Sequence, residues 1–508
     1  TIEFGDDGTA ADSNVITGAL EGDNLATVNI VLNDTNETAG GIDIPTLDFA
    51  TATVNISGAS DVDINSATAG SINAASATGA LDIALVGAAT VATVTTGSGA
   101  DTLTQTTADL TTGGYTLSTG DGNDTITLLA SADSSVDGGT GVDEVNFDGD
   151  YTARTISLTN VEVLDIDTAA TVDSSMLTGQ SYVVKDTVAS TGAYNVTVDG
   201  QVADLGGLSL DSGTVTSFTV SNAVFGAVLS TTYTGTSVID NFTAGANGDT
   251  ANLGGGADTF VGGAGADVVY GGAGNDSSLA GAGGADAIYG EAGNDTITGG
   301  GANDTISGGE GADTITGGTG NDSIDVSEVT AVVDDIIFEA AATNGMDTIT
   351  GFATGTGVDT VSLVNADMTD AAVDAAGAAY AANSVIDLLS EATTLVTSGA
   401  AFVLASNSTQ TGIIEITTTL DTDVSLGATS TGNDLLQALS SDATEAASIT
   451  VTTAGDDGYI IAYQSGNAYL WNYTNDANTA VIASELSLVS VFEGVTAGSF
   501  AEGDFIIA

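Results

Sequence analysis

The residues with the clearest chemical potential in this sequence are aspartates that recur at a fixed spacing. Nine of them follow one another at steps of nine residues, with a single step of ten. They are Asp249, Asp258, Asp267, Asp276, Asp286, Asp295, Asp304, Asp313 and Asp322. A glycine-rich run such as Gly317–Asn321 precedes most of them, and an apolar residue such as Ile297 stands two places after most. A flexible linker has no reason to keep carboxylates in register with apolar residues, so the pattern predicts a repeated structure.

The chemistry that fits this repeat is the binding of calcium. Glycines permit positive φ angles, so a six-residue turn can direct its carbonyl oxygens inward. Each aspartate adds a hard anionic oxygen, and calcium takes about six to eight oxygen ligands. The other three residues predict a short strand whose apolar side chain lies between two stacked sheets. Two repeats complete one coil, so we expect Asp258 to lie over Asp276, and Asp295 over Asp313, with a shared ion at each pair.

Two irregularities qualify this pattern. The ten-residue step between Asp276 and Asp286 predicts a local bulge or offset and an altered calcium site. A second, less regular cluster at residues 97–150 contains three more candidate ligands, Asp101, Asp124 and Asp143. Ordinary Asp-Gly turns remain the alternative explanation for this cluster.

The repeat G-G-x-G-x-D-x-U-x resembles the RTX, or hemolysin-type, calcium-binding nonapeptide. The stretches Asp347–Phe352 and Gly357–Leu363 also resemble the strands that follow and cap the roll in RTX proteins. Asp347 and Asp359 therefore join the candidate metal ligands. The resemblance implies an all-β fold of parallel β-roll or β-helix segments, with multiple calcium ions as the cofactor.

Composition agrees with a fold that cations complete. The chain of 508 residues has a formal net charge of −66, no histidine, and only Arg154 and Lys185 as basic residues. Such a chain repels itself strongly when no cation is bound. Because 42% of the residues are hydrophobic, the chain is nevertheless not a disordered acidic segment. We expect folding and metal binding to be one equilibrium.

Charge and composition also exclude several partners. Nucleic acids and anionic membranes need basic residues that the chain lacks, and no apolar run is long enough for a spanning helix. Arg154 and Lys185 are expected to form local salt bridges. Cysteine is absent, so calcium takes the place of disulfides as the cross-link. Thr1 is not an initiating methionine, so we expect the sequence to begin inside a longer precursor.

The order of patterns predicts five segments. These are a β-solenoid-like segment at 1–96, the first RTX cluster at 97–150, a β-rich segment at 151–239, the main RTX β-roll at 240–327, and a C-terminal capping β domain at 328–508. The last segment is expected to carry one or two short helices, at 370–382 and at 433–439, the latter with an N-cap at Thr431 or Asn433. The runs 459–463 and 468–473 predict a hairpin that turns at Ser465-Gly466-Asn467.

Among RTX proteins, the chain is similar to the calcium-dependent S-layer proteins of the Caulobacter type. The order of Thr53–Gly58, the first cluster, Thr159–Leu164, the main roll and a late β domain carries this likeness. The acidic residue and apolar run at Asp504–Ala508 resemble a type I secretion signal. The resemblance implies a self-assembled lattice on the cell surface. It also implies anchoring to outer-membrane lipopolysaccharide or glycan through an N-terminal region that has no counterpart in this sequence.

Enzymatic functions fit the residues poorly. RTX proteases hold zinc with H-E-x-x-H and RTX lipases need a Ser-His-Asp triad, and both require histidine. Paired carboxylates could in principle serve a glycosidase, but with 68 acidic residues no pair stands out. We therefore predict that the chain is not an enzyme. The alternative to a lattice protein is a secreted RTX adhesin or a calcium-dependent filament or biofilm-matrix subunit.

Overall fold

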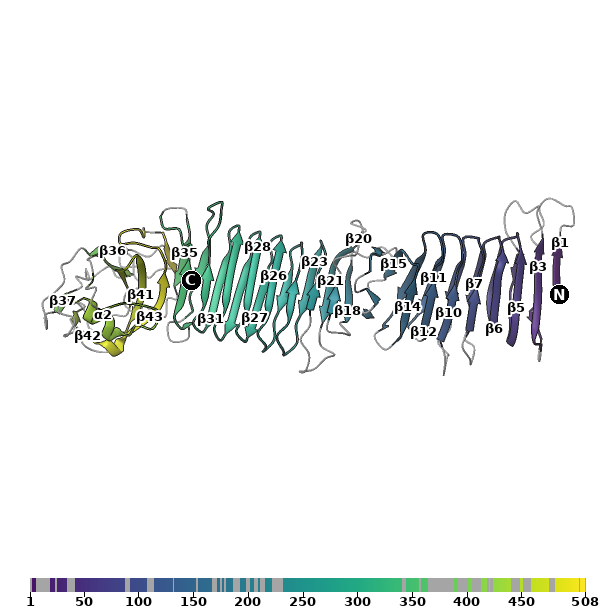
Figure 1. The fold of residues 1–508 in the computed structure, drawn as a ribbon, viewed down its shortest axis with the longest axis horizontal. Helices are drawn as coiled ribbons and strands as arrows, with labels where there is room; N and C mark the ends of the chain where they lie inside the picture. The colour runs from purple at the N-terminus through teal and green to yellow at the C-terminus, as the bar shows by residue number, and fades with distance from the viewer. Residues whose placement is uncertain are drawn as a thin grey trace. The chain divides into compact units, whose positions relative to one another are not determined.

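The computed structural model describes the following residues: 2–5, 19–22, 25–33, 42–86, 92–106, 114–130, 132–151, 154–166, 171–173, 176–177, 180–185, 192–197, 202–204, 209–210, 215–221, 232–339, 344–355, 358–363, 388–391, 401–403, 413–417, 420, 424–439, 448–450, 458–474, 480–501 and 503–507. The chain divides into two compact units, Thr1–Val224 and Phe225–Ala508. Each unit consists mainly of β-strands that pair in parallel to form a solenoid (Figure 1). The predicted all-β solenoid is therefore confirmed, whereas the division into five segments stays a prediction.

The first unit begins with strands that supply both faces of a solenoid. The earliest are β1 (Ile2–Gly5), β2 (Leu20–Glu21), β3 (Thr27–Asn33), β4 (Ile42–Ile44), β5 (Leu47–Gly58) and β6 (Val62–Ala77). The long strand β6 pairs in parallel with two later strands, β7 (Leu81–Leu85) at its start and β8 (Ala92–Thr95) near its end. One strand thus turns the corner between the two faces, and alternate side chains of β6 are buried over most of its length.

The two faces of this unit then continue with shorter strands. One face adds β10 (Gly114–Ser118), β12 (Asp133–Asp137) and β14 (Ile156–Thr159) to β8. The other adds β9 (Thr102–Gln105), β11 (Thr125–Leu129), β13 (Glu144–Asp148), β15 (Val163–Ile166), β17 (Val183–Lys185) and β20 (Ser209–Leu210) to β7. The unit also contains β16 (Thr171–Asp173), β18 (Gly192–Thr197), β19 (Val202–Asp204) and β21 (Val215–Ser221).

The roll of the second unit consists of two parallel sheets. The first contains β23 (Ile239–Thr243), β25 (Thr259–Val261), β27 (Ser278–Gly283), β29 (Thr296–Gly301), β31 (Thr314–Thr319), β33 (Asp335–Ile337) and β35 (Thr360–Leu363). The second contains β22 (Thr232–Thr234), β24 (Thr250–Asn252), β26 (Val268–Ala273), β28 (Ala287–Ala292), β30 (Thr305–Glu310), β32 (Ser323–Asp325) and β34 (Asp347–Thr350). Both sheets continue past residue 327, where the regular nonapeptides end.

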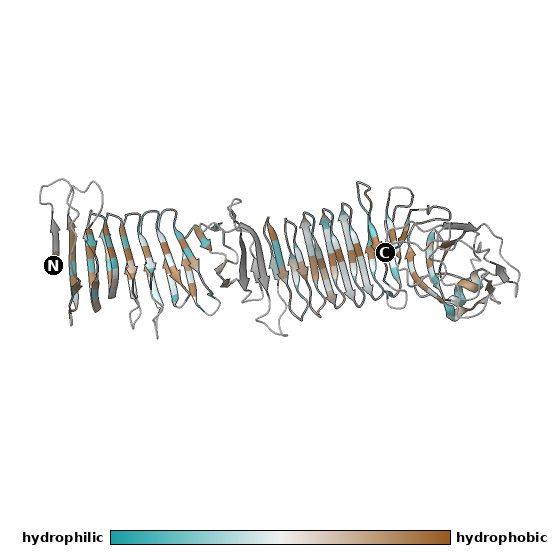
Figure 2. Cartoon of the chain, turned by 180° about the vertical axis from the view of Figure 1, so that it is seen from behind, coloured by the Kyte–Doolittle hydropathy of each residue, from teal (hydrophilic) through white to brown (hydrophobic). Residues whose placement is uncertain are grey.

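One buried apolar side chain from each strand forms the core of the roll. Phe260, Leu279, Ile297 and Ile315 pair in sequence across the first sheet, and each is fully buried. Figure 2 shows the resulting band of hydrophobic residues across successive strands. The apolar position that follows each aspartate therefore has the inward role that its spacing predicts.

The C-terminal part of the second unit extends both sheets of the roll. In the second sheet β34 pairs with β43 (Leu486–Phe492), which continues through β41 (Asn467–Tyr473), β40 (Gly458–Gln464), β38 (Ile413–Ile416) and β36 (Leu388–Glu391). In the first sheet β35 pairs with β44 (Phe505–Ile507), so this late strand lies beside β35 (Figure 1). A separate small sheet contains β37 (Ala401–Val403), β39 (Ser448–Thr450) and β42 (Ala480–Val481).

Short helical elements and a hairpin complete this part. Helix α2 (Gly432–Ala438) begins after the N-cap Thr431, whose backbone N–H donates to Asp434 Oδ2 at 2.6 Å, and η3 (Ala483–Glu485) is a single 3₁₀ turn. The predicted helix and its Thr431 cap are confirmed, whereas residues 370–382 lie outside the described part of the chain. Strands β40 and β41 form the predicted hairpin, with positive φ at Ser465 and Gly466, as a two-residue type I′ turn requires.

Candidate metal centre

The recurring aspartates of the roll form two columns, one at the start of each sheet's strands. The first column is Asp240, Asp258, Asp276, Asp295, Asp313, Asp334 and Asp359, and the second is Asp249, Asp267, Asp286, Asp304, Asp322 and Asp347. Within each column, the backbone N–H of one aspartate donates to Oδ1 of the aspartate one coil later. For Asp258 and Asp276 this distance is 2.8 Å, and for Asp295 and Asp313 it is 2.9 Å. The predicted stacking of these pairs is confirmed.

The second carboxylate oxygen has a different environment. Oδ2 is buried and has no hydrogen-bond partner among the described residues in Asp258, Asp276, Asp286, Asp295, Asp304, Asp313 and Asp322. A buried acceptor without a partner costs about 1–3 kcal/mol, and more when it is charged. Because the same oxygen is left free in successive coils, it is a regular feature of the roll. A row of free anionic oxygens fits the hard ligands that calcium requires.

Glycines make room for this oxygen and shape the turn around it. A Cβ added at Gly271 would lie 2.3 Å from Oδ2 of Asp276, and one added at Gly308 would lie 2.3 Å from Oδ2 of Asp313. The next glycine, Gly272, has a φ of 100°, which L-residues rarely adopt. The glycines therefore keep a cradle open beside most of the free carboxylate oxygens of the roll.

Three positions of the glycine turns carry a side chain despite positive φ. Ala282 and Glu291 each have a φ of 73°, and Ala302 has a φ of 85°. Left-handed backbone costs a non-glycine residue about 1–2 kcal/mol. These turns keep their conformation because the neighbouring coils impose it.

Burial also changes the ionisation of the columns. Burial is the main reason that the pKa of Asp258, Asp295 and Asp304 is raised to about 7. Backbone hydrogen bonds lower the pKa in part, and neighbouring carboxylates contribute to the rise. The pKa of Asp334 and that of Asp347 are likewise about 7, chiefly through burial. Without a cation, the ionised columns are thus unfavourable near neutral pH, and a bound divalent cation would favour the ionised form.

The ten-residue step lies between Asp276 and β27. The extra residue is Ser277, so the buried Leu279 follows Asp276 by three places, yet it still pairs with Phe260 below and Ile297 above. The predicted local offset is present. The ladder distance from Asp276 N to Asp295 Oδ1 remains 2.8 Å across this step. The hydrogen-bonded ladder is therefore continuous across the step, and the altered calcium site stays a prediction.

The first unit has a shorter column of the same design. Leu81 N donates to Asp101 Oδ1, Asp101 N to Asp124 Oδ1, and Asp124 N to Asp143 Oδ1, at 2.7–2.9 Å. Oδ2 of all three aspartates is buried without a described partner. The column ends at Glu162, whose Oε2 accepts from Asp143 N at 2.9 Å. The three residues predicted here share the geometry of the roll, which ordinary Asp-Gly turns do not explain.

The structure thus brings all fourteen sequence-predicted residues into three columns and adds members that the prediction missed. Asp240 stands nine residues before Asp249, with Phe242 two places after it, so the regular spacing could have found it. The gap between Asp322 and Asp334 is longer than nine residues, so the nine-residue spacing does not predict Asp334. Glu162 differs in residue type, and only its place before a strand signals it.

The two basic residues take no part in these columns. Lys185 Nζ lies 2.7 Å from Glu144 Oε2, so the predicted salt bridge is confirmed for Lys185. Arg154 instead donates through Nε to the backbone oxygen of Ala130 at 3.0 Å, and among the described residues no ion pair is found for it.

Comparison with protein families matches the RTX calcium-binding nonapeptide repeat (4 copies) to residues 243–278, 280–315 and 298–327. No curated protein matches the chain significantly. Across the described residues, no helix is both long enough and apolar enough to cross a membrane. The matched residues coincide with the regular part of the two columns. Residues 243–327 are therefore RTX calcium-binding repeats within a parallel β-solenoid.

Proposed function

We propose that this chain is a secreted structural protein that folds on binding extracellular calcium and assembles into a two-dimensional lattice on the cell surface. The observation that supports this most directly is the set of columns with a free, buried carboxylate oxygen in coil after coil. The fourteen predicted aspartates, together with Asp240, Asp334 and Glu162, would hold the ions with the oxygens of the glycine turns. Calcium would supply the positive charge that the chain lacks.

Charge favours self-association through calcium over other partners. With a net charge of −66, two copies repel each other unless cations lie between them. The same ion can therefore complete the fold and permit contact between copies. The lattice and its anchoring to lipopolysaccharide or glycan rest on the likeness to S-layer proteins, and type I export rests on the likeness of residues 504–508 to a secretion signal.

No enzymatic activity is part of this proposal. RTX β-solenoids are typically structural, and the chain has no histidine to serve as a general base or to bind zinc. Its carboxylates in the columns are occupied on Oδ1 by backbone hydrogen bonds. They are arranged to bind ions in series and do not form an isolated pair around a substrate.

The test is electron microscopy and light scattering of the purified chain, with chelator and with millimolar calcium. We expect monomers in chelator and ordered sheets with calcium. Magnesium at the same concentration is the control, because it demands a rigid octahedral shell and should not replace calcium. Linear fibres with calcium would favour the filament or matrix alternative. Monomers under both conditions would contradict the lattice, and the absence of calcium binding would contradict the whole proposal.

A further inference from the structure

The turn between β32 and β33 departs from the repeats below it. It spans residues 326–334, lies almost wholly beyond the matched repeats, and contains no glycine. Its position in the column is nevertheless regular, because Asp334 Oδ1 accepts from Asp313 N at 2.9 Å. The column thus continues here without the glycine cradle that accompanies it elsewhere.

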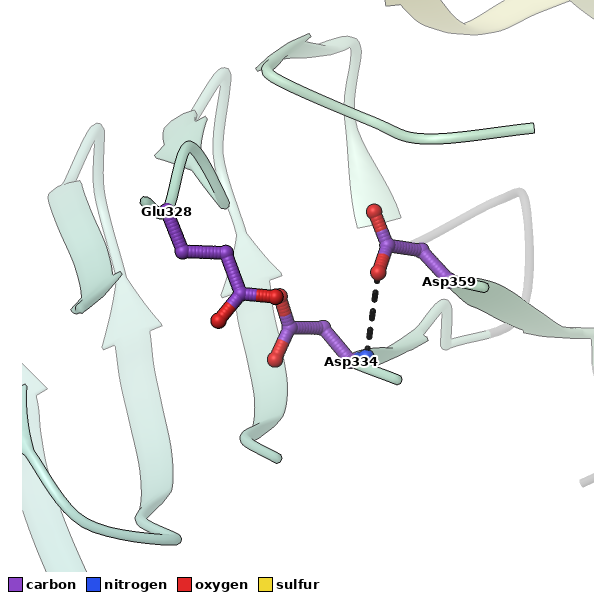
Figure 3. Close-up of side chains that lie close together, drawn as sticks. All are labelled: Glu328, Asp334 and Asp359. Carbon is purple, nitrogen blue, oxygen red and sulfur yellow. Dashed lines mark hydrogen bonds between the residues drawn. The ribbon is translucent and has the colours of Figure 1, made fainter. Parts of the chain in front are cut away.

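A glutamate from this turn reaches the column. Carboxylate oxygens of Glu328, Asp334 and Asp359 lie within 4.8 Å of one another. Figure 3 shows the Glu328 carboxylate pointing toward that of Asp334, while Asp334 N donates to Asp359 Oδ1 at 3.1 Å. Glu328 Oε2 also accepts from Gly311 N at 3.4 Å, so the side chain lies over the turn that ends at Asp313.

An independent feature of that lower turn points to a ligand. Asp313 is 1% exposed, and its Oδ2 has no hydrogen-bond partner among the described residues. This oxygen points into the turn of Gly308–Asp313, because a Cβ at Gly308 would lie 2.3 Å from it. Glu328 covers the same turn and contributes to the raised pKa of Asp313, after burial. The free buried oxygen of Asp313 and the added carboxylate of Glu328 therefore belong to the same turn, Gly308–Asp313.

No protein cation can neutralise these four carboxylates. Both basic residues of the chain, Arg154 and Lys185, belong to the first unit and stand beside Ala130 and Glu144. Three aspartates of one column and a glutamate from the adjoining turn, with one free buried oxygen at Asp313, require either protons or a metal ion. The ligands would all be carboxylate oxygens, from the buried aspartates and the partly buried Glu328. Such a set suits a large, hard divalent cation with flexible coordination geometry.

We propose that Glu328, with Asp313, Asp334 and Asp359, binds a calcium ion in a site that the nonapeptide repeat does not encode. In this site the Glu328 side chain takes the place of the glycine turn that the coil at 326–334 lacks. This inference rests on one part of the proposed function, the binding of calcium by the roll, and does not depend on lattice assembly. It adds a cation at the end of the roll, next to the strands of the C-terminal part.

The test compares Glu328→Gln with Glu339→Gln by native mass spectrometry and calcium titration of the full chain. Glu339 is exposed, and its side chain has no described hydrogen bond, so the control removes the same charge from the same unit. We expect Glu328→Gln to bind about one calcium ion fewer, or to bind its weakest ion at least about tenfold less tightly. The control should match the wild type. An unchanged titration for Glu328→Gln would overturn the site while leaving the repeats as calcium sites.

A second measurement needs no variant, so it decides the question even if Glu328→Gln fails to fold. Crystals of the wild-type chain grown with calcium are measured at long X-ray wavelength. We expect an anomalous peak between Glu328, Asp334 and Asp359. If anomalous peaks appear in the columns of the repeats but none appears between Glu328, Asp334 and Asp359, the additional site is overturned and calcium binding by the repeats still holds. Absence of peaks throughout would contradict calcium binding by the roll as well.

Discussion

The two oxygens of a column aspartate such as Asp295 or Asp313 serve different purposes. Oδ1 accepts a hydrogen bond from the backbone of the preceding coil, whereas the buried Oδ2 has no hydrogen-bond partner among the described residues. An asparagine could still accept the backbone hydrogen bond through its one side-chain oxygen, but it would carry no charge. Replacing aspartate with asparagine therefore separates metal binding from the hydrogen-bonded ladder.

The double change Asp295→Asn and Asp313→Asn tests this separation. We expect fewer bound calcium ions and a lower melting temperature in calcium, because two anionic ligands are lost. In chelator the same variant should be at least as stable as the wild type, because a buried charge is removed. Calcium titration and calorimetry measure both effects.

The matched control is the pair Asp325→Asn and Glu339→Gln, which removes two exposed charges from the same unit. It should leave calcium stoichiometry unchanged. If the column variant and this control behave alike in calcium, the column aspartates are not ligands.

A second prediction concerns Ala302, which has a φ of 85°. Ala302→Gly should stabilise the roll by about 1 kcal/mol, because glycine tolerates this backbone without strain. The same change at Ala266, an exposed turn alanine without positive φ, should destabilise by about 0.5–1 kcal/mol. Thermal unfolding at fixed calcium measures both, and equal effects at the two sites would show that Ala302 is unstrained.

The raised pKa values predict an unusual pH dependence. Folding raises the pKa of Asp295 and that of Asp304 from an ordinary value near 4 to about 7, chiefly through burial. The calcium-free fold therefore holds more protons than the unfolded chain between about pH 4 and 7. We expect its stability to be greatest in acid and to be lost as the pH rises through about 7. Calcium affinity should show the opposite trend, since protons compete for the same oxygens.

Melting temperatures of metal-free protein at several pH values, with calcium titrations at each, check this dependence. A calcium-free chain that becomes more stable as pH rises from 5 to 8 would be incompatible with protonation of the buried columns.

At the scale of elements, parallel stacking places identical side chains directly over one another. On the first unit, Asn55 Nδ2 donates to Asn29 Oδ1 at 2.8 Å, so stacked amides support each other. Asp43, Asp63 and Asp82 are stacked in the same way on neighbouring strands, and there the charges repel. The pKa of Asp63 is raised by burial and then by these two neighbours.

We therefore expect Asp63→Asn to stabilise the first unit by about 0.5 kcal/mol in chelator at neutral pH and low salt. Asp82→Asn should gain less, because Thr102 occupies its other side. Chemical denaturation measures the difference. A gain at Asp63 that persists at high salt would contradict an electrostatic origin.

The regular spacing of the repeats also determined which column residues and which buried positions could be predicted from the sequence. The sequence placed the columns and the buried apolar positions wherever coils have equal length, because each coil then repeats the same contacts. Asp334 escaped prediction because its turn is longer, and Glu328 because its role depends on a fold-back onto Gly311. The long strand β6 was also not foreseen as a corner that joins two faces, since short apolar runs do not reveal which strands continue.

At the scale of the molecule, the two units depend on cations to different degrees. Among described residues, the first unit has one carboxylate column with three free buried Oδ2 atoms, whereas the second has two columns with seven. Strands β3 to β7 of the first unit have an apolar core, which includes Ile30, Ile64 and Ile83, and contribute no carboxylate to the column. Removal of calcium should therefore affect the roll first.

Hydrogen exchange measured with calcium and with chelator tests this order. We expect strands β26 to β31 to lose more protection on chelation than strands β3 to β7, since local stability follows local interactions. Magnesium should not restore the protection. Equal loss in both units would show that they unfold together.

The end of the roll adds a constraint of timing. Strand β44 pairs with β35, and Asp504 there accepts from Gly355 N at 3.1–3.2 Å, although the two segments are distant in sequence. Phe505 packs against Phe500 with their ring centroids 5.0 Å apart, so this closure is well packed. The edge of β35 therefore stays open until a contact forms between residues 149 positions apart in the sequence. Completion of this sheet is then set by the closure of a long loop as much as by the supply of calcium.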